Sequence, residues 1–312
     1  MQQSQAQSSR EQQHSRKAEL VLDAKATLGE GPHWHAEQKK LYWVDIIGGS
    51  FHRFDPAAGT NETFRVGKSV GAVVCDAADG EAVILATRDG FERYHCVTGE
   101  LTPIADPEAH LQDNRFNDGK CDSAGRFWAG TMQDVEEVVT GSFYVLDNDL
   151  SCRKVHGDVG VSNGLAWSLD ETVLYYIDSM KQTVTAFDYD REAGTIGNPR
   201  LAIDFQPEEG LPDGMTIDSE GMLWIAHWDG WQVSRWNPET GEKLDSIYVP
   251  VAKASSCIFG GEALDTLYIT TASVGLTEET RGAEPHAGSL FACKPGVTGT
   301  PTHLFRSDKS FT

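Results

Sequence analysis

Four oxygen-bearing side chains recur at one phase of a repeat, and each is followed, at once or after one residue, by glycine. They are Glu30, Asn117, Asn163 and Asp213. A single Asn-Gly or Asp-Gly pair is ordinarily a turn signal, but glutamate has no such preference. Carboxylate and amide oxygens are hard ligands that suit a divalent cation. The pattern therefore predicts a shared cation site, with open positions for water and a substrate.

These residues begin units that repeat about every 45 residues, a period typical of propeller blades. The units start near residues 30, 71, 117, 163, 213 and 256, and clear copies read EGPHWHAEQKKLYWVDI and NGLAWSLDETVLYYIDS. Each unit pairs strand-like runs with polar turns, and long amphipathic helical stretches are absent. We therefore predict an all-β fold, a six-bladed β-propeller with about four antiparallel strands per blade. Unit starts then lie on a ring around the central axis.

One propeller domain accounts for residues 18–312, and the Gln- and Ser-rich stretch 1–17 is predicted to be a disordered tail. The last repeat copy, from Ser256, is followed by the end of the chain. The segment AELVLDAKATL, before Glu30, is strand-like. This arrangement suggests a closing blade made from both ends of the chain.

The charge and cysteine content restrict the partners and the compartment. Lys plus Arg is 26 and Asp plus Glu is 47, a net charge of −21, which disfavours nucleic acid and anionic membrane as partners. The six cysteines contain no C-x-x-C pair and suit reduced thiols in a cytoplasmic protein. No secretory signal and no run long enough to span a bilayer is evident. We expect a cytoplasmic protein without a membrane partner, and the oligomeric state stays open.

Five strings along the chain carry a family resemblance. They are LGEGPHW, RFNDGKCDSAGRFWAGTM, GVSNGLAWSLDETVLYYID, LPDGMTIDSEGMLWIAHW and CIFGGEALDTLYITTA. In this order they resemble the signatures of the gluconolactonase and regucalcin-like (senescence marker protein) family of sugar lactonases, from about residue 18 to residue 305. The resemblance implies a metal-dependent carboxylic ester hydrolase that opens a sugar lactone to its aldonic acid in carbohydrate catabolism.

The resemblance also implies roles for individual residues. It makes Glu30, Asn163 and Asp213 the metal ligands, and it places Arg115 and Asn117 on the substrate side. From the residues alone, Arg115 equally fits a surface ion pair with Asp113 or Asp118. A further substrate-binding glutamate of some family members falls at Val135 or at the neighbouring Glu136, so the sequence leaves its equivalent open.

The expected cofactor is one divalent ion, Ca²⁺ first, with Zn²⁺, Mn²⁺, Mg²⁺ or Fe²⁺ as alternatives. Such an ion would polarise the lactone carbonyl, while Asp213 orients or deprotonates the attacking water. Cation binding lowers the pKa of a carboxylate and weakens it as a base, so a hydroxide on the cation is the competing nucleophile. Two other functions stay open: a non-enzymatic calcium-binding regulatory protein, and a calcium-dependent propeller esterase or phosphotriesterase.

Four other features have structural interpretations, and for two of them a place in the pocket also stays open. Ser162 lies in a formal G-x-S-x-G string, but a strand follows where a nucleophile elbow needs a helix. His33 and His35 have the H-x-H spacing of some zinc sites, without further ligands at zinc spacing. His227 fits either the pocket or a packed position. The tryptophans are predicted to be blade core, except that Trp228 and Trp231 could instead wall a sugar site.

Overall fold

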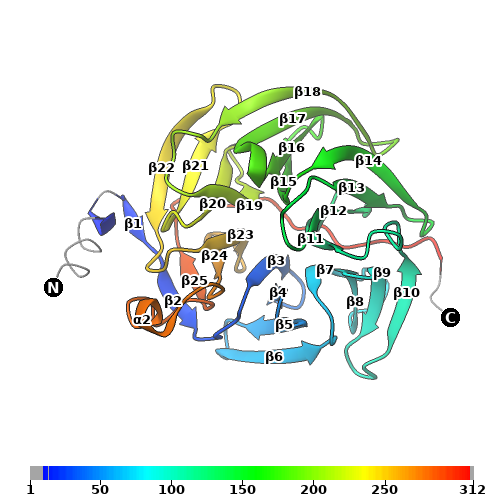
Figure 1. The fold of residues 1–312 in the computed structure, drawn as a ribbon, viewed down its shortest axis with the longest axis horizontal. Helices are drawn as coiled ribbons and strands as arrows, with labels where there is room; N and C mark the ends of the chain where they lie inside the picture. The colour runs from blue at the N-terminus through cyan, green and yellow to red at the C-terminus, as the bar shows by residue number, and fades with distance from the viewer. Residues whose placement is uncertain (1–9, 13, 310–312) are drawn as a thin grey trace.

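The computed structural model describes residues 10–12 and 14–309, which form six β-sheets arranged as a ring (Figure 1). The prediction of a six-bladed β-propeller is thereby confirmed. Five sheets contain four strands and one contains five. Within every blade, strands that follow one another in the chain pair antiparallel. The core consists of apolar side chains packed between adjacent sheets.

The strands of the first three blades are β3–β6 (Gly29–His35, Lys40–Asp45, Ser50–Asp55, Thr60–Arg65), β7–β10 (Val70–Cys75, Ala82–Thr87, Gly90–His95, Leu101–Ala105) and β11–β14 (Asn114–Cys121, Phe127–Gln133, Gly141–Leu146, Cys152–Val159). Those of the next two are β15–β18 (Ser162–Trp167, Val173–Asp178, Thr183–Asp190, Thr195–Asp204) and β19–β22 (Leu211–Ile217, Leu223–Trp228, Gln232–Asn237, Glu242–Tyr248). The last blade contains β23–β25 (Ala254–Gly260, Thr266–Thr271, Leu290–Cys293). The short helices η1 (Ser179–Lys181) and α2 (Glu278–Arg281) lie in connections.

The ring is closed by a strand from the N-terminal part of the chain. Strand β2 (Glu19–Leu22) pairs antiparallel with β25 and becomes the outer strand of the last blade. The predicted closing blade made from both ends of the chain is confirmed. Strand β1 (Arg16–Lys17) also pairs, in parallel with β22, so the last two residues of the predicted disordered tail form a strand. Residues 1–9 and 13 of the predicted tail lie outside the described residues.

The first strand of each blade lies nearest the axis (Figure 1). All six of these strands carry an irregularity of register at the same phase. The register shifts fall at Glu30/His33, Val70/Ala72, Phe116/Asp118, Ser162/Leu165, Pro212/Met215 and Ala254/Ser256. A bulge interrupts the alternation of a strand and re-aims a side chain. The repeat phase recognised in the sequence is therefore the phase of these bulges.

The glycines after two of the site residues serve close approach of strands rather than a turn. A Cβ atom on Gly164 would lie 2.7 Å from the Asp213 carbonyl oxygen, and one on Gly214 would lie 2.0 Å from Ser256 Oγ. Both glycines lie inside strands, β15 and β19. Inner strands of neighbouring blades thus meet at the axis only because these positions lack a side chain.

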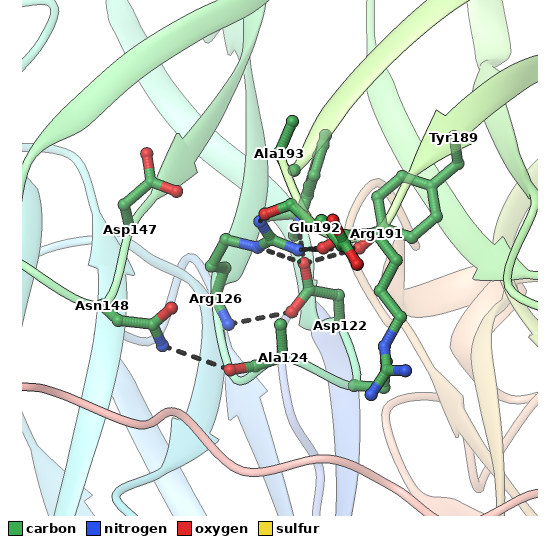
Figure 2. Close-up of polar contacts among 12 residues, drawn as sticks. Asp122, Ala124, Arg126, Asp147, Asn148, Tyr189, Arg191, Glu192 and Ala193 are labelled. Carbon is green, nitrogen blue, oxygen red and sulfur yellow. Dashed lines mark hydrogen bonds and ion pairs between the residues drawn. The ribbon is translucent and has the colours of Figure 1, made fainter.

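At the opposite end of the inner strands, a buried aspartate ties neighbouring blades together. Asp122, just after β11, accepts hydrogen bonds from Arg126 Nε (2.7 Å), Trp128 Nε1 (2.8 Å) and Tyr189 Oη (2.8 Å). Figure 2 shows Arg126 and Tyr189 converging on this carboxylate, with Arg126 also reaching the Glu192 carbonyl. Because Tyr189 belongs to β17, the network joins the third blade to the fourth.

The cysteines and tryptophans agree with their predicted structural roles. All six cysteines are unpaired, and Cys75, Cys121 and Cys257 are buried. Trp43, Trp128 and Trp224 are among the largest fully buried side chains, and Trp34 is also buried. Across residues 10–12 and 14–309, no helix has the length and apolar character needed to cross a membrane.

Candidate metal and substrate site

One end of the central channel holds a cavity of about 100 Å³ that collects every predicted site residue. We call it the upper pocket, and it is defined by Glu30, Arg115, Asn117, Asn163 and Asp213. These residues come from four blades, on β3, β11, β15 and β19. Each is at most 6% exposed. Residues up to 183 positions apart in the sequence, Glu30 and Asp213, therefore face one small polar space.

A hydrogen-bond relay fixes the orientation of the Asn163 amide. Ser179 Oγ donates its only proton to the Pro212 carbonyl oxygen at 2.6 Å, so it must accept from Asn163 Nδ2 at 2.9 Å. The amide oxygen of Asn163 is thereby directed away from Ser179. This atom is buried and has no hydrogen-bond partner among the described residues. An unsatisfied buried acceptor that lines a pocket is suited to bind a cation or a hydrogen-bond donor.

The two carboxylates of the upper pocket repel each other, and the charge of Arg115 offsets only part of this repulsion. Burial, followed by the charge of Asp118, raises the pKa of Glu30 to about 8. Burial, followed by the charge of Glu30, raises the pKa of Asp213 well above its usual value. A hydrogen bond joins the two groups, so one proton between them relieves part of the repulsion. A bound cation would relieve it in place of that proton.

Asp118 is a third buried acid beside this pair. Its Oδ1 accepts from the Gly119 amide at 2.7 Å, and burial raises the pKa of this carboxyl group. It is 5% exposed, so it is not the surface partner of Arg115 that the sequence left open. Asp118 adds negative potential at the channel wall and favours a cation there.

Arg115 is buried and held by two side chains. Its Nε donates to Asp134 Oδ1 at 2.7 Å and its Nη1 donates to Asn117 Oδ1 at 2.6 Å. Asn117 in turn donates from Nδ2 to the Ser162 carbonyl oxygen at 2.8 Å. No described residue accepts from Arg115 Nη2, which leaves paired donors for a ligand. The surface ion pairs with Asp113 or Asp118 are wrong, because the true partner is Asp134.

The loop after β12 places one of the two residues considered for an additional glutamate at the pocket. Glu136 lines the upper pocket, whereas Val135 is 62% exposed and does not line it. Glu136 has a φ of 55°, a left-handed conformation that turns the chain at this point. Trp228 also lines the pocket with apolar neighbours such as Met180, while Trp231 lies elsewhere.

The other motifs have structural roles. Ser162 accepts from Tyr176 Oη at 2.7 Å and lies in β15, which leads to another strand. His33 Nε2 accepts from the Cys75 amide at 3.4 Å and His35 Nδ1 from the Gln38 amide at 3.3 Å. The buried His227 contacts the Glu209 carbonyl and Ser234 Oγ. It is therefore a packed histidine and does not line the upper pocket.

The donor set fits a hard divalent cation that is bound partly by a neutral oxygen. Within the described part of the chain, no group of three or more His, Cys, Asp and Glu side chains is arranged to hold a metal ion. The upper pocket instead offers two carboxylates and the unpartnered amide oxygen of Asn163. A set of oxygen ligands suits Ca²⁺, Mg²⁺ or Mn²⁺ better than it suits Zn²⁺, which favours nitrogen and sulfur ligands.

Sequence reasoning missed Ser179 and Asp134, which orient Asn163 and Arg115. Ser179 lies on η1 and Asp134 in the loop after β12, so each reaches its partner from outside the strand that carries that partner. Neither has a distinctive spacing from its partner, so no signal in a single sequence identifies them. The buried state of Asp118 was open to prediction, because the residue lies between Asn117 and a glycine at the repeat phase.

Comparisons with known proteins place this chain among related propellers. Residues 28–273 match the family model described as SMP-30/Gluconolactonase/LRE-like region. A Bacillus subtilis (strain 168) protein provisionally named a sugar lactone lactonase, YvrE, is 41% identical over 93% of this chain and 99% of its own length. Regucalcin of Gallus gallus is 40% identical over 93% of this chain and 98% of its own length. A solved regucalcin from Agrobacterium tumefaciens, described as a calcium-binding protein, superposes with a TM-score of 0.88 at 26% identity, over 93% and 98%.

Proposed function

Because this chain belongs to the SMP-30/gluconolactonase/LRE-like family, we propose that it hydrolyses a sugar lactone to the aldonic acid with the help of one divalent cation. The observation that carries the proposal is the unpartnered amide oxygen of Asn163 beside the two buried carboxylates. Glu30, Asn163 and Asp213 would hold the ion, and Arg115 and Asn117 would hold the substrate.

Calcium is the first ion to test. Asn163 supplies a neutral oxygen, and the Ser179 relay holds this oxygen toward the pocket before any ion arrives. Glu30 and Asp213 supply the negative charge. The description of the Agrobacterium relative as calcium-binding supports the same choice. Carbohydrate catabolism in the cytoplasm is the setting we propose for the reaction.

The substrate side of the upper pocket is built for a polyhydroxylated ring. Arg115 is anchored by Asp134 through Nε and by Asn117 through Nη1, so its Nη2 can donate to a ring or hydroxyl oxygen at low entropic cost. We propose that Glu136, which lines the same pocket, accepts a hydrogen bond from a substrate hydroxyl group. Trp228 and Met180 give an apolar surface against which the carbon skeleton can pack.

A lactone needs a polarised carbonyl, an activated water and a proton for the leaving oxygen. When bound, the cation supplies positive charge at the carbonyl oxygen. Asp213 accepts a proton from water as the water oxygen bonds to the carbonyl carbon. The bond from that carbon to the ring oxygen then breaks, and Asp213 returns the proton to the ring oxygen. The products are a carboxylic acid and a free hydroxyl group, so atoms and charge balance.

The decisive experiment removes and restores the cation. Protein stripped with a chelator is reloaded separately with Ca²⁺, Mg²⁺, Mn²⁺ and Zn²⁺, and ring opening of five- and six-membered aldonolactones is followed by acid release. We expect acceleration above the spontaneous rate with at least one ion. Absence of acceleration with every ion and lactone would contradict the proposed activity.

A calcium-binding role without catalysis is the second candidate, favoured by the likeness to proteins named regucalcin. It predicts tight Ca²⁺ binding by protein that leaves every lactone untouched. A panel that adds aromatic esters and phosphotriesters separates the third candidate, since the apolar wall near Trp228 also suits such substrates. Preference for hydrophilic lactones supports our proposal, and preference for the aromatic esters opposes it.

A further inference from the structure

We propose that the opposite end of the channel holds a second binding site, which takes a small organic carboxylate. The cavity there, called the lower cavity, has a volume of about 230 Å³, several times the roughly 30 Å³ that one water occupies in the liquid. It is defined by Lys120, Trp167, Thr216, Ile258 and Thr302. None of its lining residues lines the upper pocket.

The same three inner strands serve both cavities. On β11, β15 and β19, one residue faces the upper pocket and the residue three positions later faces the lower cavity. The pairs are Asn117 and Lys120, Asn163 and Ala166, and Asp213 and Thr216. Three residues of an extended strand span about 10 Å, so the two spaces are separate along the channel. Occupation of one does not require occupation of the other.

Two buried hydrogen-bonding atoms of the lower cavity lack partners. Trp167 Nε1 and Thr302 Oγ1 are inaccessible to solvent and have no hydrogen-bond partner among the described residues. Both residues line the lower cavity. The indole nitrogen can only donate, so what it lacks is an acceptor. Because a water-sized oxygen does not reach this nitrogen as the side chain stands, the indole must shift towards the cavity for a ligand oxygen to supply that acceptor.

Lys120 adds a positive charge to these donors. Its Nζ donates to the carbonyl oxygens of Leu165 (3.1 Å) and Met215 (2.8 Å), and an ammonium group has a third N–H. Glu171, the carboxylate that lines the cavity, is already paired with Arg191 at 2.7 Å. Burial lowers the pKa of Lys120, and the charge of Asp118 opposes this by stabilising the ammonium form. One cation with neutral donors suits a monovalent carboxylate better than a phosphate.

Apolar walls and a crossing segment complete the site. Ile217, Ile258 and Leu169 line the same space, so the acid should carry an apolar body. After β25, the chain runs across this end of the ring (Figure 1) and is attached by bridges from Gly299 to Asp218 and from Phe305 to Asp76. That segment supplies Thr302 and covers one side of the cavity.

The test uses benzoate as the probe and the indole N–H resonances of the eight tryptophans as the readout. In ¹⁵N-labelled protein, the Trp167 signal is assigned by its loss in Trp167→Phe. Titration with benzoate should move this signal downfield and saturably. Benzyl alcohol, which has the ring without the charge, should move it at least tenfold less at equal concentration.

Variants and competitors decide between the outcomes. Lys120→Met and Thr302→Val should each weaken benzoate binding at least fivefold, and Thr302→Val guards against loss of folding in the lysine variant. Asn163→Ala, which removes a proposed ligand of the upper pocket, should leave the response unchanged, so this test is independent of the proposed function. No saturable shift, an equal shift with benzyl alcohol, or tighter binding of inorganic phosphate would each overturn the proposal.

Discussion

The two ends of the central channel are built on the same strands yet have opposite chemistry. The upper pocket presents the carboxylates of Glu30 and Asp213 with an unpartnered amide oxygen. The lower cavity presents Lys120 and an unpartnered indole N–H. Along β11 the change from acceptor to donor takes three residues, from Asn117 to Lys120. The two proposals therefore assign a cation to one end of the scaffold and an anion to the other.

The contrast arises from strand geometry as much as from residue type. At the upper end, a bulge in every inner strand breaks the alternation of side chains and lets the unit-start residues face the axis. At the lower end the strands are regular, and the turns are stabilised by hydrogen bonds to buried carboxylates such as that of Asp122 (Figure 2). Residues 299–305 cross this end and add Thr302 to the polar groups that the blades supply there.

The largest expected effect is at the upper end, in Asp213→Asn. The change keeps a ligand oxygen but removes the base, so kcat for the best lactone should fall at least about 1000-fold, within the range of general-base contributions. Turnover is measured at saturating cation, with cation binding checked by calorimetry. Near-normal turnover with the ion bound would show that Asp213 is not the base.

Cation affinity gives the next largest effect. Asn163→Ala should raise the Kd of the ion about 100-fold, and Ser179→Ala, which only frees the amide to rotate, about 10-fold. Calorimetric titration of stripped protein measures both. Thr302→Val, at the lower end, is the matched control and should leave the Kd unchanged. Equal losses in all three variants would mean general destabilisation rather than a local ligand effect.

Substrate contacts on the loop after β12 should give a smaller change. Glu136→Gln removes a charged acceptor and should raise KM about 10-fold with kcat nearly unchanged, as expected for one hydrogen bond to a charged group. Val135→Ala, one residue away and exposed, should behave like the parent protein. If the valine variant changes KM and the glutamine variant does not, the assignment of Glu136 is wrong.

The smallest effect is on the pH dependence of stability and arises at His33, where the bulge of β3 ends. Burial lowers the pKa of His33 to about 3. Below its usual value of 6.5, the unfolded state binds a proton that the folded state does not, so this residue costs stability as pH falls from 6.5 towards 3. Between pH 6.5 and 5.5 the loss is about 1 kcal/mol. Urea unfolding at saturating cation should show this slope flattened in His33→Gln.

The fold could be predicted from the sequence because the repeat records it directly. Strand, turn and strand recur with one spacing, so the number of blades and the shared phase of Glu30, Asn163 and Asp213 follow from alignment of the units. The closing strand was also predictable from the strand-like segment before Glu30. Strand β1 was not, because Arg16 and Lys17 have no β preference and pair only where β22 presents an edge.

The candidate site was predictable in its members but not in their support. Position along a repeat says which residues face the axis, and the structure brings the predicted ones together in the upper pocket. Position along a repeat does not say which neighbours orient these residues, because Ser179 and Asp134 reach their partners from a helical turn and a loop. The lower cavity was invisible for the same reason: Thr302 arrives from a segment outside the repeat.

Closure by β2 has a consequence for how the protein is made. Strand β2 pairs with β25, and Asp23, beside β2, accepts a hydrogen bond from Ser289, 266 positions further along the chain, so β2 can pair only after β25 has been synthesised. Until then both edges of the ring stay open, and unpaired edges invite association with other chains. Closure of the ring therefore depends on a pairing between distant segments, which forms slowly because the entropy of loop closure opposes it.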